Sequence, residues 1–392
     1  MIKLSNHIEK NTQAFSFIVK RFLRTTTNFN QNNNNSNDLN NKNLINKKVC
    51  KGKVPPIEEL GQITYWTHPH LFSISNATDF SKQVTPGLTK QEYEQRRTNY
   101  VNHLISYQAY YFSNKLSKSE KASLKEAKNI DKINHNFIAI IPSSTTTFMA
   151  PDVMHTFKQN SDFLYLTGFQ ETDSVLVLSR TDSDISNNSY QTALFVKEKD
   201  PKKELWEGPN TGPQMAPKLT GIQKAYPLKE FKAYLDSLVK ETNPNKKITL
   251  WRYPTDHVKQ ESGPNCKITS VEDDIDKLIQ ENISNKLIDM SEKEPINASV
   301  AASYFNTSRY FVQLCRVKKS KSELDIMRQA CDISSEAFMN TMRITHPFIN
   351  EHLIYSKFDY DCRIRGSEYL AYIPVVAGGP RATVLHYIRY FD

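Results

Sequence analysis

The chain has 392 residues, a formal net charge of +9, 38% apolar residues and 24% charged residues, a composition typical of a folded globular protein. It contains no run of 18 apolar residues, so we expect no membrane-spanning helix. Its five cysteines include no CxxC pair, which argues against a disulfide framework and a structural zinc site and fits a reducing compartment. At this length we expect two domains.

The positive charge is concentrated at the amino terminus. Residues 1–50 hold eight Lys or Arg side chains and two acids, and they therefore contribute +6 of the +9. The remaining chain has no basic stripe with interleaved aromatic residues. We therefore expect no nucleic-acid partner.

Residues 1–27 read as a targeting segment. Phe15, Ile18, Val19, Phe22 and Leu23 follow helical spacing, and the basic residues fall on the opposite side. A basic, acid-poor amphipathic start is typical of a mitochondrial transit peptide, which predicts mitochondrial localisation; an ordinary surface helix or a basic tail is the alternative. Residues 28–46 include eleven asparagines, so we predict a disordered spacer over 28–53.

The pattern from residue 54 to residue 315 predicts one α/β domain. Thr89 and Glu92 form the pattern of a capping box at the start of a helix, and 227–241 also reads as helical. Short apolar runs rich in β-branched and aromatic residues predict strands. These runs cover 136–142, 162–169, 174–179, 192–197 and 247–253.

One stretch of this domain combines polar and apolar residues in an unusual order. A polar cluster from Lys158 to Asp162 runs directly into an apolar segment, turns at Gly168 and continues through Glu171 into the next predicted strand. Taken alone, the stretch predicts a hairpin with a polar lip.

The same stretch, KQNSDFLYLTGF over 158–169, resembles the amino-terminal domain of the aminopeptidase P and creatinase family. That family more often has arginine where this chain has Lys158, and lysine keeps the charge without the bidentate fork. Further matches follow in family order, and they point to its mitochondrial branch, the Xaa-Pro aminopeptidase 3 and intermediate-cleaving peptidase group. They are THPHLF (67–72), DPKKELWEGPNTG (200–212), RVKKSKSELDIMRQACDISSEAF (316–338) and AYIPVVAGGPRATVLHY (371–387).

The resemblance implies a fold, a reaction and a cofactor. It implies that 316–392 begins a pita-bread catalytic domain and that the family's enzymes are homodimeric peptidases that remove amino-terminal residues from peptides. Two manganese ions, held by two Asp, one His and two Glu, would supply the hydroxide and stabilise the oxyanion. All five ligands follow the LHY strand in the family. We therefore expect a carboxy-terminally truncated chain, with no metal site and no activity of its own.

Two site residues carry over from the resemblance. His386 matches the active-site histidine that contacts the substrate, and Tyr372 matches a substrate-contacting tyrosine of the mitochondrial branch. The ordinary alternatives are a structural histidine and a packing tyrosine. Pro380 departs from the asparagine that is common in this turn, and it removes an N–H group.

The acids after residue 316 do not show metal-ligand spacing with His346, His352 or His386, and the pair His68 and His70 reads as a turn element. For 316–392 we predict helices over 322–345 and 350–365 and strands over 370–377 and 383–388. The apolar stripe on the first helix should be left exposed. It consists of Leu324, Met327, Cys331, Ser334 and Phe338.

Two functions remain open at this point. The first is a mitochondrial manganese metallopeptidase lineage acting on peptides. The second is a non-catalytic binding or dimerisation module derived from the same family.

Overall fold

The computed structural model describes residues 83–115, 136–150, 153–181, 184, 189–243, 246–253, 287–289 and 308–388. The chain divides into residues 1–53 and residues 54–392, and the fold described below belongs to the second unit. The predicted transit peptide, the predicted spacer and the His68–His70 turn lie outside the described residues.

A mixed sheet forms the centre of the amino-terminal domain, with strand order β10-β9-β3-β6-β7-β8. β3 pairs antiparallel with β6, as does β6 with β7, and the other neighbours are parallel. The strands are β3 (Phe137–Pro142), β6 (Val175–Arg180), β7 (Gln191–Val196), β8 (Lys224–Pro227), β9 (Ile248–Arg252) and β10 (Leu287–Asp289). Four of the five predicted strands, those over 136–142, 174–179, 192–197 and 247–253, are thereby confirmed.

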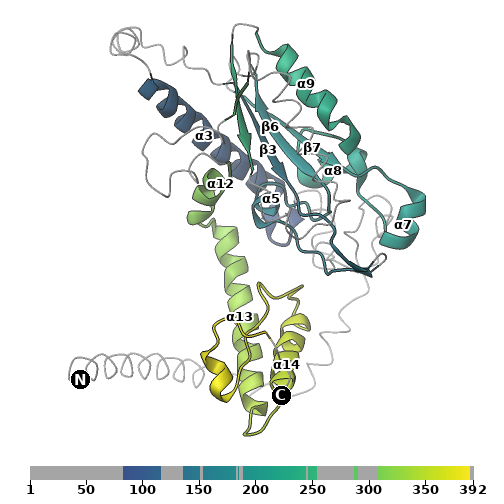
Figure 1. Cartoon of the computed structure of the whole chain (residues 1–392), viewed down its shortest axis with the longest axis vertical. Helices are drawn as coiled ribbons and strands as arrows, with labels where there is room; N and C mark the ends of the chain where they lie inside the picture. The colour runs from purple at the N-terminus through teal and green to yellow at the C-terminus, as the bar shows by residue number, and fades with distance from the viewer. Residues whose placement is uncertain are drawn as a thin grey trace, which may run out of the picture. The chain divides into compact units, whose positions relative to one another are not determined.

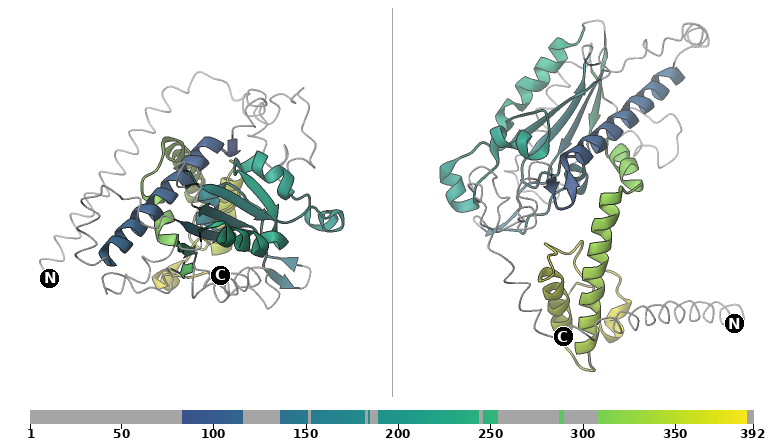
Figure 2. Two further views of the ribbon diagram at one scale, coloured as in Figure 1. Left: turned by 90° about the horizontal axis from the view of Figure 1, so that it is seen from above. Right: turned by 180° about the vertical axis from the view of Figure 1, so that it is seen from behind.

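The sheet is buried on both faces, because successive side chains of a strand point to opposite sides. Phe137, Ala139 and Ile141 of β3 enter one apolar core, and Ile138 and Ile140 enter the other. Helices cover the two cores on opposite sides of the sheet, as Figures 1 and 2 show for α3 and α9. This layered arrangement is the α/β class that the sequence predicts.

The first core is covered by α3 (Lys90–Lys115), α5 (Ser161–Thr167), α8 (Gly212–Thr220) and α12 (Ser308–Val317). The second is covered by α9 (Phe231–Glu241), which follows the short 3₁₀ turn η4 (Leu228–Glu230). A further short helix, α7 (Pro201–Glu207), and two small hairpins complete the domain. The hairpins are β1 (Gln83–Thr85) with β2 (Leu88–Thr89) and β4 (Phe148–Ala150) with β5 (Val153–Met154).

An aromatic cluster fixes α12 in this domain. Trp251 of β9 lies in an edge-to-face arrangement with Phe311 of α12, at 5.2 Å between ring centroids. Tyr107 of α3 lies 5.3 Å from the same Phe311 ring. The segment that leads toward residue 316 is therefore part of the amino-terminal core.

The predicted strand over 162–169 is wrong, because this segment forms helix α5. The side chain of Asn160 accepts hydrogen bonds from the backbone N–H groups of Asp162 (2.9 Å) and Phe163 (3.1 Å), and so caps the helix. Gly168, at φ 68°, ends it by donating its N–H to Leu164. With α5 a helix, the predicted hairpin is not formed.

After α12 the chain forms a pair of packed helices. α13 (Lys321–Ile344) and α14 (Glu351–Arg363) confirm the predicted helices over 322–345 and 350–365. The rings of Phe338 and Phe358 lie 4.6 Å apart between the two. None of the helices in the part of the chain that the structure describes is long and apolar enough to span a membrane.

The predicted strands over 370–377 and 383–388 are wrong. The described residues of this segment contain no strand, and its regular element is a 3₁₀ turn, η6 (Gly379–Thr383). A strand is stabilised by hydrogen bonds to a neighbouring strand, and an apolar run without such a neighbour does not form one.

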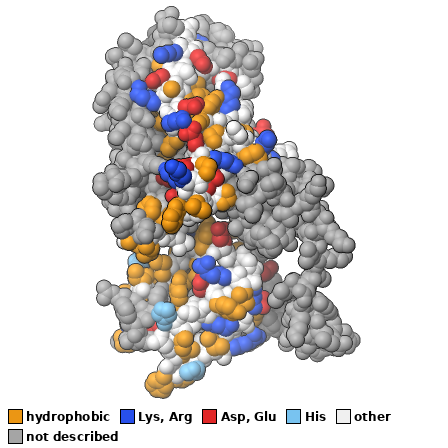
Figure 3. Space-filling model, turned by 90° about the vertical axis from the view of Figure 1, so that its right-hand side faces the viewer, with side chains coloured by type: hydrophobic (Ala, Val, Ile, Leu, Met, Phe, Trp, Pro, Cys, Tyr) orange, Lys and Arg blue, Asp and Glu red, His pale blue; other side chains and the backbone are white. Residues whose placement is uncertain are grey.

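The predicted exposed stripe on α13 is confirmed at its large side chains. Leu324, Met327 and Phe338 are 40%, 48% and 57% exposed, and Met342 further along is 65% exposed. Figure 3 shows hydrophobic side chains gathered at the surface on the face that it presents.

Candidate functional site

The motif at 158–169 begins with a side chain that ties several loops together. Gln159 is buried, and its Oε1 accepts hydrogen bonds from the N–H of Ser144 and of Asn160, both at 2.8 Å. Its Nε2 donates to the carbonyl oxygens of Phe169 (3.2 Å) and Glu171 (2.9 Å). Both ends of α5 are therefore fixed by one amide, a role that suits glutamine because it donates and accepts at once.

Asp162 of the same motif anchors α12. Its buried carboxylate accepts a hydrogen bond from Tyr253 Oη at 2.7 Å and pairs with Arg316 of α12. Arg309, also on α12, lies 3.9 Å away. Burial, and then the nearby Asp162 charge, raise the pKa of Tyr253, which stays protonated as the donor. The motif therefore holds the helix that leads into α13.

Gly168 is required where α5 ends. Its φ of 68° lies in the left-handed region, which side chains disfavour. A Cβ atom there would also stand 2.5 Å from Val84 and 2.8 Å from Tyr93. The glycine allows the β1 strand and helix α3 to pack directly against the end of α5.

A second cluster joins α3 to the start of α13. We call it the Arg96 cluster; it consists of Glu92, Arg96, Ser320 and Glu323. Ser320 caps α13 by accepting the N–H of Glu323 at 3.1 Å, and Glu323 accepts the N–H of Ser320 at 2.8 Å. The Ser320 hydroxyl also donates to Glu92 at 2.6 Å. Besides the two hydrogen bonds of the capping box, Ser320 therefore makes a third bond, which joins the start of α13 to α3.

Arg96 holds the two acids of that cluster together. Its guanidinium lies 2.9 Å from Glu92 and 3.5 Å from Glu323, and the residue is 5% exposed. It also stacks over the ring of Tyr165 at 4.4 Å. The predicted capping box at Thr89 is formed only in part, because Thr89 accepts from Glu92 N–H but the Glu92 carboxylate turns to Arg96 and Ser320.

Lys158 reaches the segment that carries Tyr372. Its Nζ donates a hydrogen bond to the carbonyl oxygen of Ala371 and lies 5.4 Å from the centre of the Tyr369 ring. A single N–H donor is sufficient to bond a carbonyl oxygen, so lysine can make this contact although it lacks the paired donors of an arginine guanidinium. These residues line an open pocket of about 880 Å³, together with Tyr165, Arg316 and Glu323.

The two predicted site residues lie on either side of a glycine turn. Tyr372 precedes Gly378 and is 78% exposed, and His386 follows the 3₁₀ turn η6 and is also exposed. Among the described residues no hydrogen bond joins the two side chains. Both side chains are open to a ligand, and the geometry of the turn determines their separation.

Glu351 holds that turn, and the sequence pattern did not single it out for this role. Its Oε1 accepts a hydrogen bond from Gly378 N–H at 2.6 Å and from Arg381 Nε at 3.0 Å. Bonding to Gly378 N–H, aided by Arg381 and Tyr387, lowers the pKa of Glu351 although its burial opposes this. One feature of the sequence could have indicated this role. Glu351 lies in the first turn of a helix whose free N–H group is already capped by Asn350, so its carboxylate is available for another partner.

The comparisons with known proteins agree along the chain. Residues 93–249 match the model described as aminopeptidase P, N-terminal domain, and residues 325–391 match that of metallopeptidase family M24. Xaa-Pro aminopeptidase 3 of Mus musculus is 34% identical over 336 residues, which are 85% of this chain and 54% of that protein. The chain belongs to the aminopeptidase P family.

Other members agree with this assignment. Intermediate cleaving peptidase 55, mitochondrial, of Arabidopsis thaliana is 24% identical over 333 residues, covering 85% of this chain and 52% of that protein. Aminopeptidase P from Escherichia coli has the same fold, with a TM-score of 0.54 at 20% identity over 77% of this chain and 56% of that one. The chain spans about half the length of the curated aminopeptidase P relatives that it matches.

The acids of α13 and α14 do not fit the metal pair that the aminopeptidase P resemblance implies. The described residues contain no group of three or more His, Cys, Asp or Glu side chains arranged to hold a metal ion. Several acids are instead paired with basic side chains. These pairs are Asp325 with Arg328 (2.8 Å), Glu336 with Arg365 (2.5 Å), Asp359 with Arg363 (2.9 Å) and Asp361 with Lys357 (2.9 Å).

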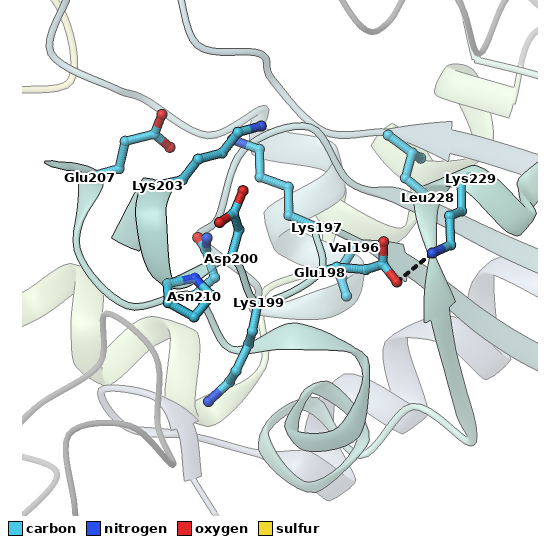
Figure 4. A pocket seen from close by; sticks show the side chains of 11 residues that line it. Val196, Lys197, Glu198, Lys199, Asp200, Lys203, Glu207, Asn210, Leu228 and Lys229 are labelled. Carbon is cyan, nitrogen blue, oxygen red and sulfur yellow. Dashed lines mark hydrogen bonds and ion pairs between the residues drawn. The ribbon is translucent and has the colours of Figure 1, made fainter. Parts of the chain in front are cut away.

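A second pocket, of about 670 Å³, lies beside the 200–212 motif that resembles the mitochondrial aminopeptidase P branch (Figure 4). Asp200 caps α7 there by accepting Lys202 N–H at 3.0 Å, and Lys229 pairs with Glu198 at 2.7 Å. Its charges are largely balanced and show no catalytic arrangement. Trp206 on the same helix is 86% exposed.

Proposed function

We propose that this chain forms the amino-terminal domain, over 54–315, and the first part of the catalytic domain, from 316, of an Xaa-Pro aminopeptidase. Such an enzyme removes amino-terminal residues from peptides. The observation that carries the proposal is the 34% identity to Xaa-Pro aminopeptidase 3 over 336 residues, which includes both parts. Fold likeness adds nothing on the reaction, because one fold hosts many functions.

In this proposal Tyr372 and His386 form the substrate side of the site. An imidazole N–H can donate a hydrogen bond to the oxygen on which negative charge develops during peptide hydrolysis, and a phenol can contact the bound peptide. Exposure of both residues leaves them available for these contacts. The alternative roles, structural histidine and packing tyrosine, are less suited to side chains that are exposed.

We propose manganese as the cofactor of the complete site. Hard carboxylate oxygens suit that ion, and a metal pair would supply an activated hydroxide for hydrolysis. Because the acids on α13 and α14 are paired with Lys and Arg, we assign no metal ligand to them. Residues 1–392 by themselves are expected to be inactive, because the resemblance implies that all five metal ligands follow the LHY motif at 385–387.

We also propose a mitochondrial location and a homodimer. The basic amphipathic segment over 1–27 supports the location, as does a relative whose name includes the word mitochondrial. Fusing residues 1–53 to a fluorescent protein should direct it to mitochondria, and Arg21→Glu with Arg24→Glu should abolish this. Fluorescence that stays in the cytosol with the unaltered fusion would contradict the location.

The homodimer is tested separately, by light scattering. A monomeric mass would contradict it.

The peptidase proposal is tested with Mn²⁺ and a short peptide that has proline at its second position. The gene product that carries this chain should release the first residue, and a chelator should stop the release. The same peptide with alanine at the second position tests the need for proline. Chelator-sensitive release by residues 1–392 alone would contradict the expectation that these residues hold no metal site of their own. Absence of release by the whole gene product would favour the non-catalytic binding module.

A further inference from the structure

Glu351 is the first residue of α14, yet its carboxylate does not serve that helix. Asn350 caps α14 by accepting His352 N–H at 2.7 Å. An acid in the first turn of a helix usually interacts with the helix's own free N–H groups or its dipole. Glu351 instead contacts Gly378 and Arg381, 27 and 30 residues further along the chain.

The segment that Glu351 contacts is not held by a sheet, and it is held at its start by the bond from Lys158 to Ala371. No strand forms among the described residues from 364 to 388. Apolar burial contributes little, because Val375, Val384 and Leu385 are 47%, 51% and 87% exposed. Glu351, by contrast, is 4% exposed. A charge-assisted hydrogen bond in such a site is about twice as strong as a neutral one.

The carboxylate contacts the loop between the two predicted site residues near its middle and just beyond its end. Gly378 lies six positions after Tyr372, and the Tyr387 hydroxyl, which also acts on Glu351, belongs to the residue next to His386. Arg381 lies between them, in η6. One side chain therefore contacts the middle of this loop, at Gly378 and Arg381, and the residue that follows His386.

We propose that Glu351 is the positioning residue of the substrate side, setting where His386 stands relative to Tyr372. This inference rests on the proposed peptidase function for its catalytic consequence, but the structural step is independent of it. In this role Glu351 acts through its bonds to Gly378 and Arg381 and not on the substrate itself. An error of about 1 Å in such positioning is enough to lower a rate by roughly 100-fold.

The first test is amide hydrogen exchange of the peptide that covers 373–388, in the full chain at neutral pH. Glu351→Gln keeps the shape but removes the charge, and we expect exchange in this peptide to rise by about 10-fold, because the hydrogen bonds to Gly378 and Arg381 lose their charged partner. Glu351→Ala should raise it further. Glu323→Gln is the matched control, because Glu323 is also an acid in the first turn of a helix but contacts Ser320 and Arg96.

A second control addresses the glycine itself. Gly378 has φ −102°, and a Cβ there would lie at an ordinary 3.5 Å from Glu351 Oε1. Gly378→Ala should therefore keep the bond and leave exchange nearly unchanged. Equal exchange of 373–388 in the wild type and in Glu351→Gln would overturn the proposal, whether or not the protein proves to be a peptidase.

The second test is kinetic, on the gene product that carries this chain. Glu351→Gln should lower kcat by about 10-fold with a smaller change in KM, because positioning acts in the transition state. Raised exchange with unchanged kcat would show that Glu351 is merely structural and would overturn the positioning role. If the wild type releases nothing from Xaa-Pro peptides, the proposed function fails, and the exchange test still decides whether Glu351 holds the loop.

Discussion

In the amino-terminal domain the side chains of β3 alternate between two apolar cores, whereas along α13 and α14 many large apolar side chains stay exposed. The sheet domain is therefore stabilised mainly by burial. The segment from 320 to 388 is held mainly by polar contacts of single residues, such as Ser320 and Glu351. Substitutions in the first region should lower stability through packing, and those in the second through individual hydrogen bonds.

The largest expected effect is at Gly168, where packing leaves no room. Gly168→Ala should lower the free energy of unfolding by about 3 kcal/mol, combining an unfavourable positive φ with overpacking against Val84 and Tyr93. Urea unfolding measures this. Gly221→Ala is the control, because Gly221 also ends a helix in the left-handed region (φ 70°, ψ 14°), but an added Cβ there would meet only the Lys90 side chain, at 3.2 Å. Its cost should be about 1 kcal/mol, and equal costs would contradict the packing argument.

The next effect is at Asp162, the anchor of α12. Asp162→Asn should cost about 2 kcal/mol, because Arg316 and Tyr253 lose a charged partner; the figure is below that of a fully buried pair since Arg316 is partly exposed. Amide exchange in α12 should rise as well. Asp236→Asn removes the partly exposed pair with Lys232 and should cost less than 0.5 kcal/mol. Similar losses for the two would count against the anchor.

A smaller effect is expected where the two regions meet. Ser320→Ala removes the cap of α13 and the bond to Glu92, and should cost about 1 kcal/mol. The measurement is helix content against temperature, with amide exchange at the start of α13. Ser334→Ala lies on the same helix and loses only a bond to Ala330, so no measurable change is expected. If both variants behave alike, the cap does not stabilise the junction.

The smallest effect is a pH dependence inside the sheet domain. Burial raises the pKa of Glu171, against the hydrogen bonds that it accepts from Thr211. The folded state therefore holds this proton more tightly than the unfolded chain, so stability falls as pH rises from the ordinary value of 4.5 through the raised pKa. Glu171→Gln should reduce that fall in urea unfolding across the window. Glu207→Gln, at an exposed position, should leave the fall in stability with pH unaltered. If Glu171→Gln shows the same dependence of stability on pH as the wild type, Glu171 is not its cause.

Much of the sheet domain could be predicted from the sequence, because β3, β6, β7 and β9 are apolar runs bounded by polar residues. The segment 162–169 is rich in aromatic residues, which favours a strand, but the spacing of its buried residues is helical. Phe163, Leu166 and Thr167 are buried at intervals of three and four, which is the helical period, and Asn160 and Gly168 are the two caps. Those cap residues were the usable signal.

The candidate site was predictable in its residues but not in its supports. Tyr372 and His386 stand in a recognisable motif, and their roles stay predictions. The contacts of Glu351 with Gly378 and of Lys158 with Ala371 join residues 27 and 213 positions apart, which no local pattern encodes. The expected strands at 370–377 and 383–388 failed for a related reason: a strand depends on a partner elsewhere in the fold.

The positions of the tryptophans have a practical consequence for spectroscopy. All three lie before residue 252, and of the two that the structure describes, Trp251 is fully buried while Trp206 is almost fully exposed. Intrinsic fluorescence should therefore combine a blue-shifted emitter, shielded from acrylamide, with a red-shifted one that is readily quenched. Loss of the blue component reports melting of the sheet domain. Residues 308–388 contain no tryptophan, so unfolding of α13 and α14 would be silent in the same signal.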